Sequence, residues 1–246
     1  MSRSEATVVA VVQARISSRR LPGKVLADIG GRPALAWVFE RLRRANELES
    51  VILATSDGSD DDPVAELGER CGVAVHRGPL EDVLGRFIGA VAPAGAEAVV
   101  RITGDCPLVE PALVDRLVRI WRGGDADYVA NVIEPRSFPK GLDAEVVSVD
   151  ALRAAAAAAT AAADREHVTS FVRDNPDRFP ARGLWMTPQM EAGRVTLDTA
   201  DDLEQLRSLL PGLGLEAGLG AIVAALGGPS DPAVSELPPP AAAAAR

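Results

Sequence analysis

Hydrophobic and polar residues follow a regular order along the first half of the chain. Stretches rich in β-branched residues predict strands at 7–14, 50–56, 96–105 and 125–132. Apolar residues at helical spacing predict helices at 33–48, 63–72, 81–95 and 111–124, several of which begin with Pro and end at Gly. This alternation is typical of an α/β fold, a mostly parallel sheet with helices on both faces that binds ligands at the carboxyl ends of its strands.

The pattern changes after residue 132. Residues 136–150 predict a loop and a strand, 151–174 an alanine-rich helix followed by a second helix, and 181–199 further strands. We expect 132–199 to extend the sheet, to form one wall of a cleft and to provide a subunit contact. Residues 227–246 lack apolar periodicity and predict a disordered tail, so that one domain spans 1–226. Deletion of 229–246 should then leave stability and activity nearly unchanged.

The composition argues against several classes of protein. The chain has 35 acidic and 26 basic residues and a formal net charge of −9, which argues against a general nucleic-acid-binding surface. Cys71 and Cys106 have the spacing of neither a disulfide framework nor a zinc site. No segment approaches the roughly 20 apolar residues that cross a bilayer. We expect a soluble, cytoplasmic protein with neither nucleic-acid nor membrane partners.

A basic loop, QARISSRRLPGK at 13–24, follows the first predicted strand. Arg15, Arg19, Arg20 and Lys24 lie within ten positions and repel one another unless an anion lies among them. A nucleoside triphosphate suits this loop, since guanidinium groups bind phosphate in bidentate fashion and Gly23 permits close backbone approach. The loop has neither the Walker A nor the G-x-G-x-x-G pattern, and a solvated charged turn is the alternative interpretation.

Two aspartates follow predicted strand ends. Asp105 in RITGDCPL is well placed to hold Mg²⁺, a hard ion that prefers carboxylate oxygens, and the alternative role is a turn residue that caps backbone amides. Asp198 in VTLDTADDLE precedes an acidic helix start and is either a second metal ligand or a helix N-cap. Local sequence does not choose between these roles.

The chain contains, in this order, QARISSRRLPGK, RITGDCPL, GLDAEV, REHVT and VTLDTADDLE. Together these motifs resemble the cytidylyltransferase family of the spore-coat polysaccharide biosynthesis type, which is related to the CMP-3-deoxy-manno-octulosonate and CMP-sialate (acylneuraminate) synthetases. The resemblance runs from about Val8 to Leu210. It implies a Rossmann-like, three-layer α/β/α nucleotidyltransferase fold of the GT-A-like type, with a mostly parallel central sheet and a small inserted β/α region.

The resemblance also implies an activity and its residues. CMP would pass from CTP to a sugar or sugar-acid hydroxyl with release of pyrophosphate, with Mg²⁺ as cofactor, in surface polysaccharide or glycoconjugate biosynthesis by a homodimer. The implied catalytic residues are Arg15, Arg20, Lys24, Asp105 and Asp198, of which Asp105 and Asp198 would bind the metal. The implied nucleotide-binding residues are Ala14, Arg15, Arg20, Lys24, Arg77 and Thr103. The acceptor would contact Arg136, Lys140, Asp143, Glu145, Arg165, Glu166 and His167. Arg19 stands where relatives usually carry Thr, and we expect it to point to solvent.

Two alternative functions remain open at this stage. A glycosyltransferase of the same fold would use a finished nucleotide sugar, whereas the basic loop favours a triphosphate. A non-catalytic nucleotide-binding module is the other alternative. The presence of both Asp105 and Asp198 counts against it.

Overall fold

A central mixed sheet organises the protein. The structure, a computed structural model, describes residues 3–237. Within them an eight-stranded sheet has the order β10-β9-β7-β8-β6-β1-β4-β5, and a short hairpin forms a second sheet. The strands are β1 (Val8–Gln13), β4 (Ser50–Ser56), β5 (Ala74–Gly78), β6 (Ala98–Thr103), β7 (Tyr128–Ala130), β8 (Glu145–Ser148), β9 (Ala181–Thr187) and β10 (Ala233–Leu237), and the hairpin joins β2 (Asp28–Ile29) to β3 (Arg32–Pro33).

The centre of the sheet is parallel, as the sequence predicts. β1 pairs in parallel with β4 and β6, and β4 pairs in parallel with β5. β8 runs antiparallel to both β6 and β7. The first five residues of β1 are buried because helices cover both faces of the sheet, which is why this strand reads as a continuous apolar run. The carboxyl ends of β1, β4, β5 and β6 therefore lie along one edge.

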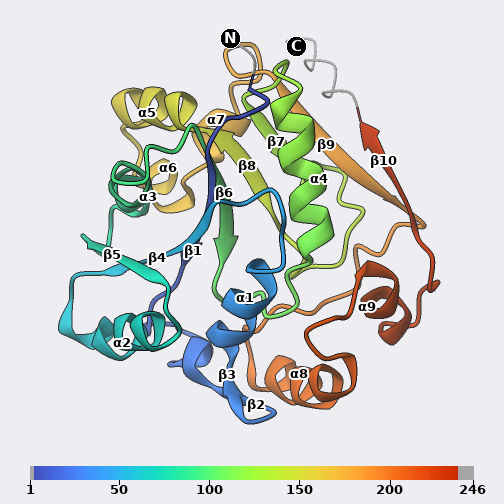
Figure 1. Cartoon of the computed structure of the whole chain (residues 1–246). Helices are drawn as coiled ribbons and strands as arrows, with labels where there is room; N and C mark the ends of the chain where they lie inside the picture. Colours follow the sequence, from blue (N-terminus) through green and yellow to red (C-terminus); the bar gives the residue numbers. More distant parts are fainter. Residues whose placement is uncertain (1–2, 238–246) are drawn as a thin grey trace.

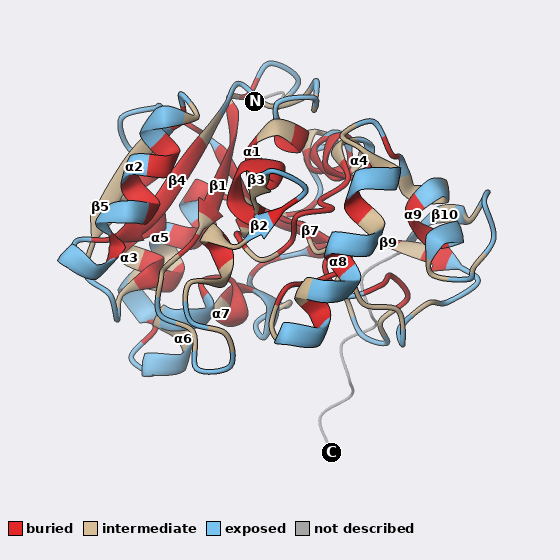
Figure 2. Cartoon of the chain, turned by 90° about the horizontal axis from the view of Figure 1, so that it is seen from below, coloured by how far each residue is buried: buried red, intermediate tan, exposed pale blue. Residues whose placement is uncertain are grey.

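Helices pack on both faces of the sheet (Figure 1). One apolar cluster joins the sheet to α1 (Ala34–Leu42), α2 (Asp62–Arg70), α4 (Pro111–Arg122) and α9 (Leu219–Ala225). The opposite cluster joins it to α3 (Val83–Val91), α5 (Val149–Ala158) and α7 (Ser170–Arg173). These helices are buried where they face the sheet and exposed on the outer side (Figure 2). The predicted α/β fold is confirmed.

Every helix in residues 3–237 is too short or too polar to span a lipid bilayer.

The second half of the chain differs in detail from the sequence prediction. The alanine-rich region divides into α5, α6 (Ala162–His167) and α7 rather than two helices. Residues 194–199, predicted as a strand, form only one isolated bridge, between Lys140 and Arg194, and then enter α8 (Ala200–Leu213). This segment crosses the carboxyl edge of the sheet instead of joining it, since the Leu197 N–H donates to Asp105 O (2.8 Å). Its alternating apolar residues, Val195 and Leu197, are buried against a third cluster that contains α8.

The prediction of a disordered tail from residue 227 onward is wrong for part of that segment. β10 pairs antiparallel with β9, with Ser235 opposite Trp185, and Val234 packs against the main core cluster. The segment reads as polar because an edge strand buries only one side and its sequence is rich in Pro, Ser and Asp. The rest of the predicted tail, 238–246, lies outside the described residues.

A chain that ends at Gly228 should consequently be less stable than the full chain. Loss of β10 removes its hydrogen bonds to β9 and exposes the apolar surface under Val234, so the melting temperature should fall by about 3 °C or more. Thermal unfolding followed by circular dichroism measures this change. Equal melting temperatures for the two chains would show that the β10–β9 pairing contributes nothing to stability.

Candidate active site

The loop after β1 is held in a fixed shape. Gly23 has φ 73°, a conformation that glycine adopts without strain, and its N–H donates to Ile16 O (2.9 Å). The buried carboxylate of Asp61 accepts hydrogen bonds from the Ile16 N–H (2.6 Å) and the Ser56 N–H (3.3 Å). These contacts hold the basic loop over the ends of β1 and β4. It leads into the short helix η1 (Lys24–Leu26).

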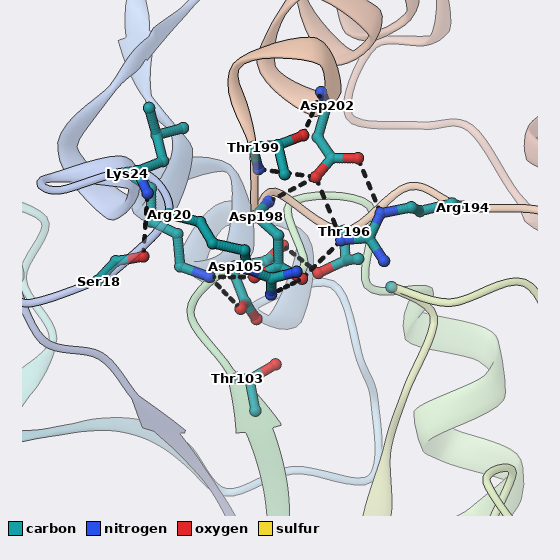
Figure 3. Close-up of polar contacts among 12 residues, drawn as sticks. Ser18, Arg20, Lys24, Thr103, Asp105, Arg194, Thr196, Asp198, Thr199 and Asp202 are labelled. Atoms are coloured by element: carbon teal, nitrogen blue, oxygen red, sulfur yellow. Dashed lines mark hydrogen bonds and ion pairs between the residues drawn. The ribbon is translucent and has the colours of Figure 1, made fainter.

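Lys24 joins two carboxylates that are far apart in the sequence (Figure 3). Its Nζ donates to Asp105 Oδ2 (2.6 Å) and to Asp198 Oδ1 (2.7 Å). Burial alone would lower the pKa of Lys24, but the charges and hydrogen bonds of the two aspartates outweigh burial and raise this pKa above its usual value. Lys24 is therefore a positive charge that both carboxylates share.

Asp198 is also held by two arginines. The Arg194 Nη2 donates to Asp198 Oδ2 (2.6 Å), and the Arg20 Nη2 lies 2.9 Å from the same oxygen. Burial alone would raise the pKa of Asp198, but hydrogen bonds from Lys24 and Arg194 and the charge of Arg20 lower it below its usual value. The Asp198 carboxylate is therefore ionised at neutral pH, in one fixed orientation.

The first turn of α8 fixes the backbone around Asp198. Thr199 is the N-cap of this helix, and it forms a capping box with Asp202 in which the Thr199 Oγ1 accepts from the Asp202 N–H (3.2 Å). The Asp202 carboxylate also accepts from the Asp198 N–H (2.9 Å) and from the Arg194 Nε (2.8 Å). Because Thr199 caps the helix, the N-cap interpretation of Asp198 is excluded.

Asp105 reaches the same point from the end of β6. The Gly104 N–H donates to Gln13 O (2.8 Å), and a Cβ at position 104 would lie 2.9 Å from the Ala14 Cβ. Only glycine lets the ends of β1 and β6 approach so closely. The Asp105 carbonyl accepts from Leu197 and from the Thr196 hydroxyl (3.3 Å), which ties the segment before α8 to this strand end.

A cavity of about 470 Å³ lies at this edge of the sheet. Of the residues predicted from sequence, it is lined by Ala14, Arg15, Arg20, Lys24, Thr103, Asp105, Glu166, His167 and Asp198. Arg15 and Glu166 lie 3.5 Å apart as an ion pair, which links the basic loop to α6. Arg19 is exposed at the same cavity, and within residues 3–237 it forms no ion pair.

Comparison with known proteins identifies the family of this chain. The sequence model of the family described as cytidylyltransferase matches residues 9–212. The chain belongs to the cytidylyltransferase family. The family that the five sequence motifs suggest is therefore confirmed, and the protein is an enzyme of the nucleotidyltransferase class.

Individual relatives cover most of the chain. It is 31% identical over 211 residues to the spore coat polysaccharide biosynthesis protein SpsF of Bacillus subtilis, across 82% of this chain and 85% of that protein. It is 32% identical over 219 residues to 3-deoxy-manno-octulosonate cytidylyltransferase of Anaeromyxobacter sp., across 82% and 84%. The structure of a cytidylyltransferase from Leptospira borgpetersenii has a TM-score of 0.86 and 28% identity, and the match covers 90% of this chain and 94% of that one.

Several residues predicted for this cytidylyltransferase do not line the cavity. Arg77, predicted to contact cytosine, donates its Nε to Ser56 O (2.9 Å) and its Nη2 to Gly58 O (2.8 Å), and it pairs with Asp62 (2.7 Å). Its guanidinium group is thus engaged by the segment that follows β4.

The residues predicted for the acceptor fall into two groups. Glu166 and His167 line the cavity, whereas Arg165 pairs with Asp82 of the α3 N-cap (2.7 Å). Arg136 pairs with Asp143 and donates to Phe138 O (3.0 Å), so these two residues stabilise the loop before β8. Burial raises the pKa of Asp143, and the charge of Arg136 opposes this rise. Lys140 is exposed outside the cavity lining.

Glu145 is buried within the sheet rather than placed for an acceptor. It is 4% exposed, and its carboxylate accepts from Arg101, from the Tyr128 hydroxyl (2.6 Å) and from the Thr169 hydroxyl (3.0 Å). Burial alone would raise the pKa of Glu145, but the charge of Arg101 and these hydrogen bonds lower it. The alternation of GLDAEV gives no sign of this network, because its partners come from three other elements.

Glu145→Gln should destabilise the protein by about 3 kcal/mol or more, because it leaves the partly buried Arg101 guanidinium without its charged partner. Urea unfolding at neutral pH measures the loss, with the exposed Glu81→Gln as a control expected to change stability by less than about 0.5 kcal/mol. Since the pKa of Glu145 is depressed in the folded protein, its stabilisation is present above the usual glutamate pKa and is lost as the pH falls below it. A difference between wild type and variant that did not shrink in acid would contradict this role.

Two residues of the site were not identified from the sequence. Arg86 in α3 is only 3% exposed yet lines the cavity, and Arg194 holds Asp198. The available signal for Arg86 was its helical spacing from Val83, which places a cation on an otherwise apolar, buried helix face. Arg194 has no such signal, because Asp198 follows it by four residues in a segment that is not helical, and this spacing predicts an ion pair only within a helix.

Proposed function

We propose that this cytidylyltransferase transfers CMP from CTP to a hydroxyl group of a sugar or sugar acid and releases pyrophosphate. The observation that carries the proposal is the convergence of Lys24, Asp105 and Asp198 at one end of a cavity bordered by a basic loop. The names of the relatives support a sugar-acid acceptor and a place in surface polysaccharide or glycoconjugate biosynthesis.

The basic loop is suited to the triphosphate. Arg15, Arg20 and Lys24 line the cavity, and cations of this kind bind phosphate oxygens through charge-assisted hydrogen bonds. Thr103 adds a hydroxyl at the end of β6. The Ala14 N–H is already bonded to Ala54 O (3.2 Å), so Ala14 has its carbonyl oxygen to offer a nucleotide.

The donor set fits Mg²⁺. Among residues 3–237 there is no cluster of three or more His, Cys, Asp or Glu that could hold a metal ion. A pair of carboxylates is the usual protein contribution to a Mg²⁺ site, since the ion keeps water and substrate phosphate in its remaining positions. Asp105 and Asp198 would hold the ion, which supplies positive charge at the α-phosphate. The Lys24 ammonium contacts the same two carboxylates, so it competes with the ion for them.

The transfer is a single displacement at phosphorus. The acceptor oxygen forms a bond to the α-phosphorus of CTP while the bond from that phosphorus to the pyrophosphate oxygen breaks, and the hydroxyl proton passes to solvent. Lys24 and Arg20 would neutralise the charge on the leaving pyrophosphate. The protein contributes mainly position and electrostatic stabilisation.

The acceptor would enter on the side of α6, where Glu166 and His167 line the cavity. Arg136, Lys140, Asp143 and Arg165 would act from outside the cavity lining by shaping the segments around it. We expect a homodimer in which 132–199 contributes to the subunit contact.

A pyrophosphate-release assay tests the proposed function. The four nucleoside triphosphates are each combined with a panel of sugar acids and Mg²⁺. Turnover should require CTP, Mg²⁺ and an acceptor together. Release that is equal with all four nucleotides would contradict specificity for CTP. Binding of nucleotide without release for any acceptor in the panel would favour a non-catalytic nucleotide-binding module instead.

A further inference from the structure

Arg86 lines the cavity and has hydrogen-bond donors without a partner in the described part of the chain. Its Nη1 donates to Pro79 O (2.5 Å) and Leu80 O (2.8 Å), which fixes the guanidinium plane. Its Nε is buried and has no hydrogen-bond partner in the described part of the chain. Within residues 3–237 the Nη2 forms no hydrogen bond or ion pair, and Asp82, the acid nearest in sequence, is paired with Arg165. The Nε–H and Nη2–H edge is thus a free donor fork.

The unpartnered Nε and Nη2 donors of Arg86 indicate a binding site for a ligand. Leaving guanidinium N–H groups without acceptors in a buried position costs free energy, and a ligand with two adjacent acceptor atoms recovers that cost. Such ligands include a phosphate, a carboxylate and a nucleobase edge.

Arg86 lies on the opposite side of β1 from Asp105. α3 packs against β5, β4 and β1, whereas Asp105 follows β6 on the other side of β1. The cavity thus extends across the end of β1, from the Asp105–Asp198 pair to Arg86. Val83 and Ala14 line it as well and offer apolar surface. A nucleotide with its phosphates at the aspartates would extend its base toward α3.

We propose that the Nε–Nη2 edge of Arg86 recognises the cytosine base by donating to its O2 and N3 atoms. This assignment rests on the proposed function. Cytosine carries two adjacent acceptors at O2 and N3, whereas uracil carries an N–H donor at N3 that would face a donor of Arg86. A fixed pair of donors therefore selects CTP over UTP. Arg77, the residue predicted for this contact, has its guanidinium group engaged by Ser56, Gly58 and Asp62.

Nucleotide analogues test this assignment on the wild-type enzyme. Binding is measured by isothermal titration calorimetry with Mg²⁺ and without acceptor. The analogue 3-deaza-CTP, which lacks the N3 acceptor, should bind about ten- to a hundredfold more weakly than CTP. The triphosphate of pyrimidin-2-one riboside keeps O2 and N3 but lacks the amino group, and it should bind within about threefold of CTP. Equal binding of 3-deaza-CTP and CTP, or a large loss for the pyrimidin-2-one analogue, would overturn the proposal.

Arg86→Lys supplies the second measurement, since it keeps the charge and removes the fork. Affinity for CTP should fall to that for UTP, while affinity for inorganic tripolyphosphate should stay within about twofold of wild type. An equal loss for CTP and tripolyphosphate would assign Arg86 to phosphate. Unchanged CTP binding with a raised KM for the acceptor would assign it to an acceptor carboxylate. If the variant does not fold, the analogue series still decides. A wild-type enzyme that binds all four nucleotides equally would instead refute the proposed function itself.

Discussion

Asp198→Asn will lower the rate of pyrophosphate release about a thousandfold or more. The substitution keeps the size of the side chain but removes the negative charge that Asp198 shares with Asp105 at Lys24. Loss of one of two carboxylates that would hold Mg²⁺ costs several kcal/mol of transition-state stabilisation, and each 1.4 kcal/mol or so is a factor of ten in rate. The rate is measured at saturating CTP and Mg²⁺ with the acceptor found by screening.

Asp201→Asn is the matched control, since Asp201 is exposed in the same first turn of α8. It should change the rate by less than about threefold, because a charge complementing the helix dipole contributes to stability rather than to transfer. Melting temperatures of both variants show whether the capping box is intact. If the two substitutions reduced the rate equally, the effect would lie in helix α8 and not in the carboxylate of Asp198.

The fold was predictable because its central elements carry local signals. β1, β4 and β6 are buried on both faces and therefore read as apolar runs, and α1 to α4 each show one apolar face. β5 and β10 did not show this signal, because edge strands bury less of their surface, as AVHRG and residues 233–236 illustrate. Whether a strand could be predicted from the sequence thus depended on how much of it is buried and not on its length.

The sequence predicted individual residues of the site but not how these residues pair. The sequence identified Lys24, Asp105 and Asp198 as candidates, but a local pattern could not choose between capping and binding for Asp198. Thr199 decides this, because it occupies the N-cap position and leaves the Asp198 carboxylate to Lys24, Arg20 and Arg194. The pairing of Asp198 with Lys24 spans most of the chain, and no local pattern contains it.

The partners of the cations in the basic loop were also not predictable from local sequence. Its cations require an anion among them, and the structure supplies carboxylates from three other segments: Glu166 for Arg15, Asp198 for Arg20, and both aspartates for Lys24. Three of the four cations are therefore paired within the protein in the absence of a triphosphate, and Arg19 is the exception among residues 3–237. A triphosphate must compete with these carboxylates, so their exchange for phosphate forms part of nucleotide binding.

Lys24→Met will raise the KM for CTP about tenfold or more and lower kcat about a hundredfold. Methionine keeps a similar length and loses the charge that would neutralise the leaving pyrophosphate. The loss should appear in both constants, because Lys24 would contact phosphate in the bound nucleotide and more strongly in the transition state. Initial rates at varied CTP measure both constants.

The chain's other lysine gives the comparison for this variant. Lys140 is exposed outside the cavity lining, so Lys140→Met should leave the KM for CTP unchanged. Manganese binding without nucleotide provides a second readout. Because the Lys24 ammonium competes for the oxygens of Asp105 and Asp198, Lys24→Met should bind Mn²⁺ more tightly than wild type. Weaker Mn²⁺ binding would show that Lys24 assembles the aspartate pair rather than competing for it, whereas an unchanged KM for CTP would remove Lys24 from the phosphate site.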